Sequence, residues 1–259
     1  MSRIITLTTD FGDTDPFSGI MKGVILGIEP KATLIDLTHK IEPQNVLQGA
    51  LMLASALPFF PPKTIHLVVV DPGVGTARRP IIVKTHDALL VGPDNGVLTA
   101  AFSGKVEAYE LTNTKYFLPT RSSTFHGRDL FAPVAAHLAA GVKPEKMGRK
   151  INNPVVLKLP RPKMDGPVLK GEVVYADRFG NLSTNITAQD IKRHLPGPPV
   201  MKLGRRTLKQ FVRTYGECEK GKPGFLINSW NAVEIFVHGD SAQQMFKLKP
   251  GSPVSLRAS

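Results

Sequence analysis

The sequence predicts two domains, an α/β domain with a largely parallel sheet followed by a smaller all-β domain. In the first half of the chain, short β-branched runs alternate with helical patterns, as is typical of an α/β domain. Residues 152–167 then carry four prolines and no helical period, which indicates an extended connection. Short strands between turn residues follow, and they predict a small barrel or sandwich. We therefore place the domains at residues 1–160 and 168–259, with a linker at 161–167.

Each element of the first domain follows from its local pattern. The run IHLVVVD is almost continuously apolar, as expected of a strand buried on both faces. Pro30 ends the first helix, Pro43 opens the second and Gly141 closes the third. A hairpin turns at His86 and Asp87. The expected strands are 4–8, 32–37, 65–71, 80–85 and 88–91, and the expected helices are 17–28, 45–57 and 130–140.

The second domain is expected to consist of short strands with one short helix. Turn residues lie between these strands, a pattern that predicts a small β-barrel or sandwich. The expected strands are 171–175, 200–203, 225–228 and 233–237, and the helix is 188–193.

The composition is that of a globular protein. Of 259 residues, 42% are hydrophobic and 21% are charged, which excludes a disordered or collagen-like chain. Cys218 is the single cysteine, so neither an internal disulfide nor a Cys-rich zinc site can form. The single cysteine also leads us to expect a cytoplasmic protein. We expect neither a secretory signal nor a membrane span, because no apolar run is long enough.

The positive charge is unevenly distributed. Residues 1–140 contain 12 basic and 12 acidic residues, whereas residues 141–259 contain 21 and 9, so the whole net charge of +12 lies in the second part. A basic domain favours nucleic acid or another anionic surface as a partner. A solvated basic face is the alternative explanation.

Common nucleotide and hydrolase motifs are missing, namely GxGxxG, GxxxxGK[ST], HExxH and GxSxG. Four polar clusters remain, and three of them follow expected strands. Asp10, in TTDFGD, is placed either to bind a ribose diol or to cap the next helix. Asp71 ends the most apolar strand and precedes Arg78 and Arg79, so it is either functional or part of a structural ion pair.

Two further clusters carry polar side chains that suit a ligand. His126, in TFHGRD, either titrates near neutral pH or bonds the backbone at a helix start. The segment DRFGNLSTN combines Asp177, Phe179 and Asn181, which suit a purine but also suit a turn. Trp230, the single tryptophan, is placed either for binding or for packing.

Together the clusters resemble one family, the S-adenosylmethionine (SAM) hydroxide adenosyltransferases, which are relatives of the fluorinase and the chlorinase. The resemblance spans nearly the whole chain and rests on ordered motifs. These are TTDFGDTDPFSGIMKGVI, VVVDPGVGTARRPI, VGPDNGVL, TFHGRD and DRFGNLSTNI.

The resemblance implies a fold, an assembly and a reaction. The fold would be an α/β/α sandwich followed by a β-barrel. The assembly would be a homotrimer, with each active site between the first domain of one subunit and the second domain of the next. The reaction would convert SAM and water into adenosine and L-methionine, with SAM as substrate and no cofactor or metal.

The resemblance also implies roles for individual residues. The reactive triad would be Asp71, Arg78 and His126, with Arg78 chosen over Arg79 by the family spacing of seven residues. In the fluorinase a tyrosine replaces the Asp and a serine replaces Gly127, so this chain matches the branch that uses hydroxide. The substrate-binding residues, from the ribose diol to the adenine and the amino-acid end, would be Asp10, Phe11, Phe125, Gly127, Asp177, Phe179, Asn181, Ser229, Trp230, Val237 and Gly239. Trp230 departs from the small residues that many relatives carry there.

In the implied reaction the leaving group is good, but the nucleophile, water, is weak at neutral pH. A sulfonium leaves as a neutral thioether, so the triad would hold a water in line behind the ribose 5′ carbon, with Asp71 or His126 taking its proton. A halogenase and a non-catalytic adenosine- or SAM-binding module are the alternatives. Because the substrate is cationic at sulfur, we expect the basic excess on the outer barrel surface, and no basic residue except Arg78 in the pocket.

Overall fold

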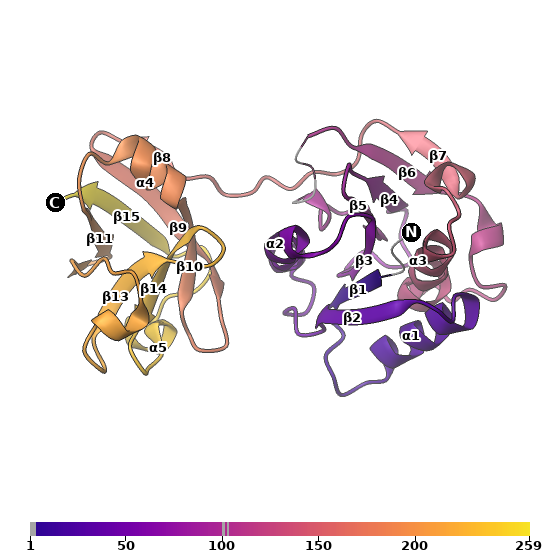
Figure 1. Cartoon of the computed structure of the whole chain (residues 1–259), viewed down its shortest axis with the longest axis horizontal. Helices are drawn as coiled ribbons and strands as arrows, with labels where there is room; N and C mark the ends of the chain where they lie inside the picture. Colours follow the sequence, from indigo (N-terminus) through magenta and orange to yellow (C-terminus); the bar gives the residue numbers. More distant parts are fainter. Residues whose placement is uncertain (1–3, 100–101, 103) are drawn as a thin grey trace. The chain divides into compact units, whose positions relative to one another are not determined.

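The computed structural model describes residues 4–99, 102 and 104–259, which form two compact units. The first unit comprises Met1–Lys158 and the second Leu159–Ser259 (Figure 1). In the described part of the chain, every helix is too short or too polar to cross a membrane.

The first unit is built on a sheet of seven strands among the described residues, in the order β2-β1-β3-β5-β4-β6-β7. The strands are β1 (Ile4–Thr9), β2 (Thr33–Thr38), β3 (Thr64–Val69), β4 (Pro80–Lys84), β5 (Ala88–Pro93), β6 (Glu107–Leu111) and β7 (Gly148–Ile151).

This sheet is mixed. Strands β2, β1, β3 and β5 run parallel, whereas β4, β6 and β7 join by antiparallel pairs. The expectation of a largely parallel sheet is therefore correct for one half and wrong for the other. The turn between β4 and β5, where Thr85 donates its backbone N–H to Ala88, is too short for the crossover that a parallel pair requires.

Helices cover both faces of the sheet. Met21 of α1 and Phe131 share one core cluster with Leu67 of β3, while Leu53 of α2 packs with Val68 on the other face. The apolar run of β3 is thus buried on both sides, as its composition predicts. The helices are α1 (Phe17–Ile28), α2 (Val46–Ala56), a π-helical turn (Gly127–Phe131), α3 (Ala132–Ala139) and the short 3-10 turns Leu57–Phe59, Thr114–Tyr116 and Pro144–Lys146.

The second unit is a barrel-like antiparallel sheet, in the order β12-β11-β15-β9-β10-β14-β13 with β8 paired to β9. Beyond β12, the Val212 N–H donates to the Phe225 carbonyl at 3.0 Å and brings the two ends of the sheet together. Its strands are β8 (Lys163–Asp165), β9 (Val168–Ala176), β10 (Leu182–Thr187), β11 (Pro199–Leu203), β12 (Arg206–Leu208), β13 (Pro223–Ile227), β14 (Ala232–Val237) and β15 (Pro253–Ala258), and its helices are α4 (Ala188–His194), α5 (Ala242–Phe246) and the 3-10 turn Tyr215–Glu217.

Several segments of the second unit differ from expectation, because β8, β10, β12, β15 and α5 were not predicted. Residues 163–165, assigned to the linker, form β8, because Gly166 adopts a φ of 55° and turns the chain back onto β9. The turn alternative for DRFGNLSTN is correct up to Asn181, but β10 then begins at Leu182.

Helix α4 is confirmed, since Thr187 and Asp190 form a capping box at its start.

Candidate active site

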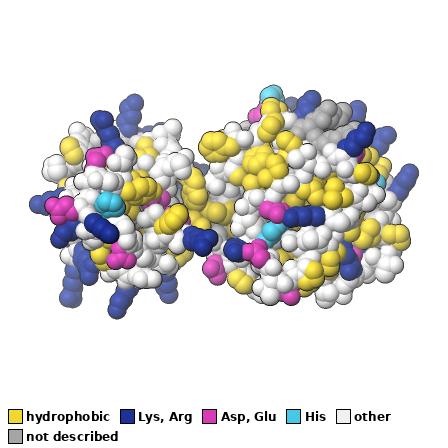
Figure 2. All heavy atoms as spheres, turned by 60° about the horizontal axis from the view of Figure 1, so that its bottom comes forward, with side chains coloured by type: hydrophobic (Ala, Val, Ile, Leu, Met, Phe, Trp, Pro, Cys, Tyr) yellow, Lys and Arg dark blue, Asp and Glu magenta, His cyan; other side chains and the backbone are white. Residues whose placement is uncertain are grey.

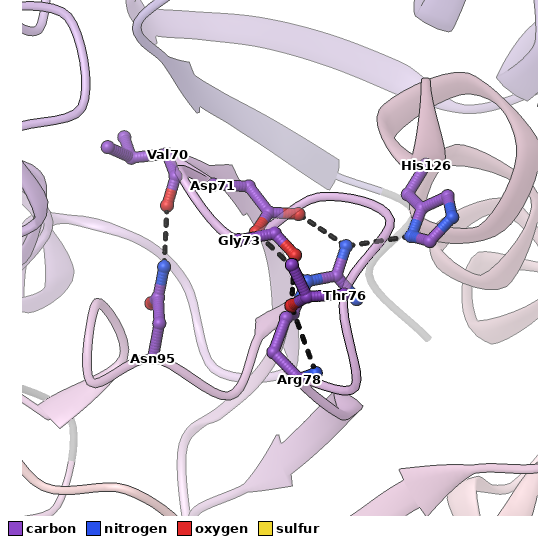
Figure 3. Close-up of polar contacts among 7 residues, drawn as sticks. All are labelled: Val70, Asp71, Gly73, Thr76, Arg78, Asn95 and His126. Atoms are coloured by element: carbon purple, nitrogen blue, oxygen red, sulfur yellow. Dashed lines mark hydrogen bonds and ion pairs between the residues drawn. The ribbon is translucent and has the colours of Figure 1, made fainter. Parts of the chain in front are cut away.

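Asp71 and Arg78 form a buried ion pair at the end of the central strand. Asp71 follows β3 and Arg78 precedes β4, so the loop between these strands presents both side chains at the carboxyl edge of the parallel half. Arg78 Nε donates to Asp71 Oδ1 at 2.9 Å and Nη2 donates to Oδ2 (Figure 3). The side chains are only 5% (Asp71) and 9% (Arg78) exposed.

His126 completes a triad around Arg78. Arg78 Nη2 lies 2.8 Å from Nδ1 of His126 (Figure 3). Because arginine only donates, Nδ1 accepts and the neutral imidazole carries its proton on Nε2. Burial lowers the pKa of His126 from its ordinary value of 6.5, and the adjacent Arg78 charge lowers it further.

Tight turns position the triad. Thr76 donates its hydroxyl to the Gly73 carbonyl at 2.7 Å and accepts the Arg78 N–H at 3.3 Å (Figure 3). Gly75 adopts a φ of +78°, and a Cβ there would lie 2.6 Å from the Ser123 carbonyl oxygen. Only glycine therefore allows the loop that carries Arg78 to pack against the loop that leads to His126.

Arg79 belongs to a separate network. Its Nε donates to Asp94 at 2.8 Å, and its Nη atoms donate to the side chain and backbone of Asn153 at 2.9 and 2.7 Å. Asp94 also accepts the Val155 N–H at 2.7 Å. Arg79 thus anchors the segment that leads out of the first unit, whereas Arg78 contacts Asp71 and His126.

Asp10 lies directly after β1, at the same edge of the sheet as Asp71. The helix-cap alternative for Asp10 is wrong, because α1 begins after Pro16 and Asp10 instead accepts the Gln44 N–H at 2.8 Å. Gln44 adopts a φ of 66°, so this bond holds a turn that the backbone alone disfavours.

An aromatic cluster lies beside His126. Phe11, Phe17 and Phe125 make edge-to-face contacts, with ring centroids 5.2 to 5.9 Å apart. A Cβ at Gly127 would lie 3.3 Å from the Phe125 ring and 3.4 Å from Phe11. Three of the predicted residues, Phe11, Phe125 and Gly127, thus lie together.

Asp129 is a residue that the sequence analysis did not single out. It is fully buried, its carboxylate is paired with Arg128 at 2.6 Å, and it accepts the Ser122 N–H at 2.6 Å. It therefore fixes the loop on which His126 lies. The adjacent Arg and Asp in TFHGRD were the available signal, since a buried carboxylate needs a partner.

In the second unit, the predicted residues line two neighbouring hollows. The first, which we call the Asn181 hollow, has a volume of about 630 Å³ and is lined by Asp177, Phe179, Asn181, Val237 and Gly239, among others. Asp177 orders this loop, because it accepts the backbone N–H groups of Phe179 and Asn181 at 2.9 and 2.8 Å and the Asn181 amide at 3.0 Å.

The second, which we call the Ser229 hollow, has a volume of about 390 Å³ and contains Ser229 and Trp230. Asp177 and Tyr215 line both hollows. Trp230 packs on Tyr175 with ring centroids 5.5 Å apart, and it also lines the hollow.

Basic side chains project from the outer surface of the second unit, at the left of Figure 2. Exposed Lys202, Arg205, Arg206 and Lys209 lie around the β11–β12 hairpin. One basic residue, Arg213, lines the Ser229 hollow. Within residues 4–99, 102 and 104–259, no group of three or more His, Cys, Asp or Glu side chains is placed so that it could hold a metal ion.

The fold and the site define a two-domain protein with a triad at the carboxyl edge of an α/β sheet and polar hollows on a barrel-like unit. Family models described as the SAM hydroxide adenosyltransferase N-terminal and C-terminal domains match residues 5–148 and 171–255. The chain belongs to the SAM hydroxide adenosyltransferase family.

Individual relatives agree with this assignment. A Salinispora tropica protein named (R)-S-adenosyl-L-methionine hydrolase is 38% identical, over 98% of this chain and 97% of its own length. The Actinopolyspora mzabensis fluorinase is 29% identical over 99% of this chain and 97% of its own. The crystal structure of an uncharacterized conserved protein from Thermotoga maritima superposes with a TM-score of 0.92 at 38% identity, covering 98% of this chain and 99% of that one.

Proposed function

We propose that the protein hydrolyses SAM to adenosine and L-methionine by attack of water on the ribose 5′ carbon. The C–S bond breaks, a C–O bond forms, and the water loses one proton. The observation that carries the proposal is the triad of Asp71, Arg78 and His126, which suits the positioning of a small nucleophile. The family and the name of the 38%-identical Salinispora tropica relative support the same reaction.

The catalytic task is to hold and activate the water. Methionine leaves as a neutral thioether, so no general acid is required. Fixing a nucleophile in line can contribute about 7–11 kcal/mol. Arg78 Nη1 is buried and has no hydrogen-bond partner among the described residues, which makes it a donor that can orient the water and stabilise hydroxide character.

We assign the proton of the water to Asp71 rather than to His126. Nδ1 of His126 already accepts from Arg78, and Nε2 carries the ring proton, so the neutral ring has no lone pair to offer. The Asp71 carboxylate has about four acceptor positions, of which Arg78 fills two. His126 then holds the Arg78 guanidinium in place, and its Nε2–H is a donor.

The remaining predicted residues are assigned to the substrate in the same proposal. Asp10 binds the ribose diol, Phe11, Phe125 and Gly127 contact the nucleoside, and Phe179, Asn181, Val237 and Gly239 bind the adenine, while Asp177, Ser229 and Trp230 surround the amino-acid end. No cofactor is required.

We also propose that the protein is a cytoplasmic homotrimer, with each active site between the first domain of one subunit and the second domain of the next. In this proposal the first unit is an α/β/α sandwich, and the second unit, which includes β8, is a closed β-barrel.

The sulfonium configuration is part of the proposal. Sulfur in SAM carries three different carbon groups and is a stereocentre, and the name of the Salinispora tropica relative specifies the R form. We propose the R sulfonium as the preferred substrate. Parallel assays of the two epimers, separated by chromatography, test this preference, and faster turnover of the S epimer would contradict it.

The reaction itself is tested by incubating the purified protein with SAM and measuring adenosine and methionine by chromatography. Equimolar products are expected. No adenosine at high protein concentration, with SAM binding retained, would instead establish a binding module. A parallel incubation with chloride or fluoride tests the halogenase alternative, for which a 5′-halo-5′-deoxyadenosine product would be diagnostic.

A further inference from the structure

The Ser229 hollow contains one positive and two negative side chains. Arg213 is the single cation among the described residues that line it, and Asp177 and Glu234 are its acids. The substrate assigned above has an amino-acid end with one ammonium and one carboxylate. The hollow therefore has the charges needed to bind both groups of that zwitterion.

The acids of the hollow suit the ammonium. Asp177 accepts three hydrogen bonds from its own loop, so about one acceptor position of its carboxylate is left. Glu234 is buried and accepts from Tyr215 at 2.7 Å and from Asn228 at 2.9 Å, so its charge lies beneath the hollow. These negative charges favour an ammonium group and disfavour an unpaired carboxylate.

Arg213 is free to bind that carboxylate. Its guanidinium forms no ion pair or cation–π contact within the described part of the chain, whereas its backbone N–H is held by Glu217 at 3.2 Å. Trp230, the neighbouring side chain in the hollow, is neutral and supplies no compensating charge. A guanidinium binds a carboxylate through two parallel hydrogen bonds, a geometry that the neutral side chains of the hollow lack.

We propose that Arg213 binds the α-carboxylate of the methionine part of the substrate and so makes the enzyme select an amino-acid sulfonium. The proposal rests on the assigned SAM hydrolysis. It makes Arg213 a specificity-determining residue that is remote from the reacting atoms, with no part in the attack of water.

The test compares two substrates in two proteins. Decarboxylated SAM has a hydrogen in place of the α-carboxylate and keeps the sulfonium and the amine. For SAM, Arg213→Ala is expected to raise KM about tenfold and to leave kcat within about twofold, because a charge-assisted hydrogen bond is lost. For decarboxylated SAM the same variant should change KM by less than about twofold, and Arg213→Lys should recover part of the loss for SAM.

Arg205→Ala is the matched control, because Arg205 is exposed on the β11–β12 hairpin of the same unit. It should leave both substrates unaffected. Equal KM effects of Arg213→Ala on the two substrates, or no effect on SAM, would overturn the proposal. If the wild-type protein hydrolyses neither substrate, the proposed function fails, whereas SAM turnover that ignores Arg213 defeats this inference alone.

Discussion

At the scale of single residues, Arg78 is the centre of the site. Its guanidinium bonds both oxygens of Asp71 and the Nδ1 of His126, and it lies 5.2 Å over the Phe131 ring. A planar, permanently charged group can make all these contacts at once, whereas an ammonium is a point charge on a flexible stem. The choice of arginine therefore fixes the relative positions of the acid and the imidazole.

The two adjacent arginines are expected to respond differently to the same substitution. Arg78→Lys removes the fork that joins Asp71 to His126, so kcat/KM for SAM should fall about 100-fold or more. Arg79→Lys weakens only the contacts to Asp94 and Asn153, so kcat/KM should stay within about threefold while the melting temperature falls by a few degrees. Steady-state kinetics and thermal unfolding measure both effects, and similar kinetic losses would contradict the assignment.

The pH dependence at low pH is expected to come from His126. Its pKa lies below 6.5, so the ring is neutral at pH 7 and becomes protonated only as the pH falls through that lowered value. Protonation puts a hydrogen on Nδ1, which then repels Arg78 instead of accepting from it. Activity should therefore be constant from pH 7 to 8 and fall with a midpoint below 6.5.

The same protonation costs stability in a defined window. The unfolded chain takes up the proton near pH 6.5, before the folded chain does, so stability from His126 is present above 6.5 and is lost as the pH falls through the folded pKa. His126→Asn keeps an acceptor oxygen but cannot titrate. Its lower activity should show no inflection between pH 5 and 7, and an unchanged acidic limb would show that another group titrates.

At the scale of elements, the site depends on two loops that lie against each other. Gly75 on the loop after β3 contacts the backbone of Ser123. Gly75→Ala is therefore expected to destabilise the fold by about 1–3 kcal/mol and to lower kcat, because the loop of Arg78 moves away from His126. Denaturant unfolding and kinetics on the same samples measure both effects.

Gly204 provides the matched control for this variant. It also adopts a positive φ, of 55°, but a Cβ there would meet nothing within 4 Å. Gly204→Ala has only the backbone strain, so kcat should be unchanged. A loss of kcat in Gly204→Ala equal to that in Gly75→Ala would show that loop contact is not the cause.

The elements also show which parts of the fold are predictable from the sequence. The continuous apolar run of β3 and the proline- and glycine-bounded helices are strong local signals, and the structure confirms them. β8 was missed because three exposed residues, Lys163–Asp165, have no apolar alternation, and their pairing depends on the turn at Gly166. β6 and β7 were missed because their pairing is long-range. Gly148 begins β7 opposite Leu111 of β6, where a Cβ would collide with the Glu110 carbonyl oxygen.

The candidate site was predictable in its residue types but not in its contacts. A spacing of seven residues suggested Arg78, yet only the direction of the loop separates its contacts from those of Arg79. Asp129 and Arg213 were not singled out, because their roles depend on burial and on which side chains line a hollow. Burial and the lining of a hollow depend on the folded chain, and no local sequence pattern indicates them.

At the scale of the whole molecule, the proposed active site needs side chains of both units. The triad lies on the first unit, and the hollows assigned to the adenine and the amino-acid end lie on the second. If each site of a trimer lies between two subunits, its two halves come from different chains. Two inactive variants, one defective in the first unit and one in the second, can then form some sites with both halves intact, and activity returns.

Mixed trimers of Asp71→Asn and Asp177→Asn test this arrangement. Each variant alone should lose most activity, the first by about 100-fold or more in kcat through loss of the proton acceptor. After co-expression, purification through two different affinity tags keeps only the mixed trimers, and each of these has one site in three that combines an intact first domain with an intact second domain, so about a third of wild-type activity should return. If each site were instead built within one chain, the activity of the mixed trimers would not exceed the summed activities of the two variants measured alone. Asp71→Asn co-expressed with His126→Asn is the control, since both defects lie on the first unit and no site can become intact.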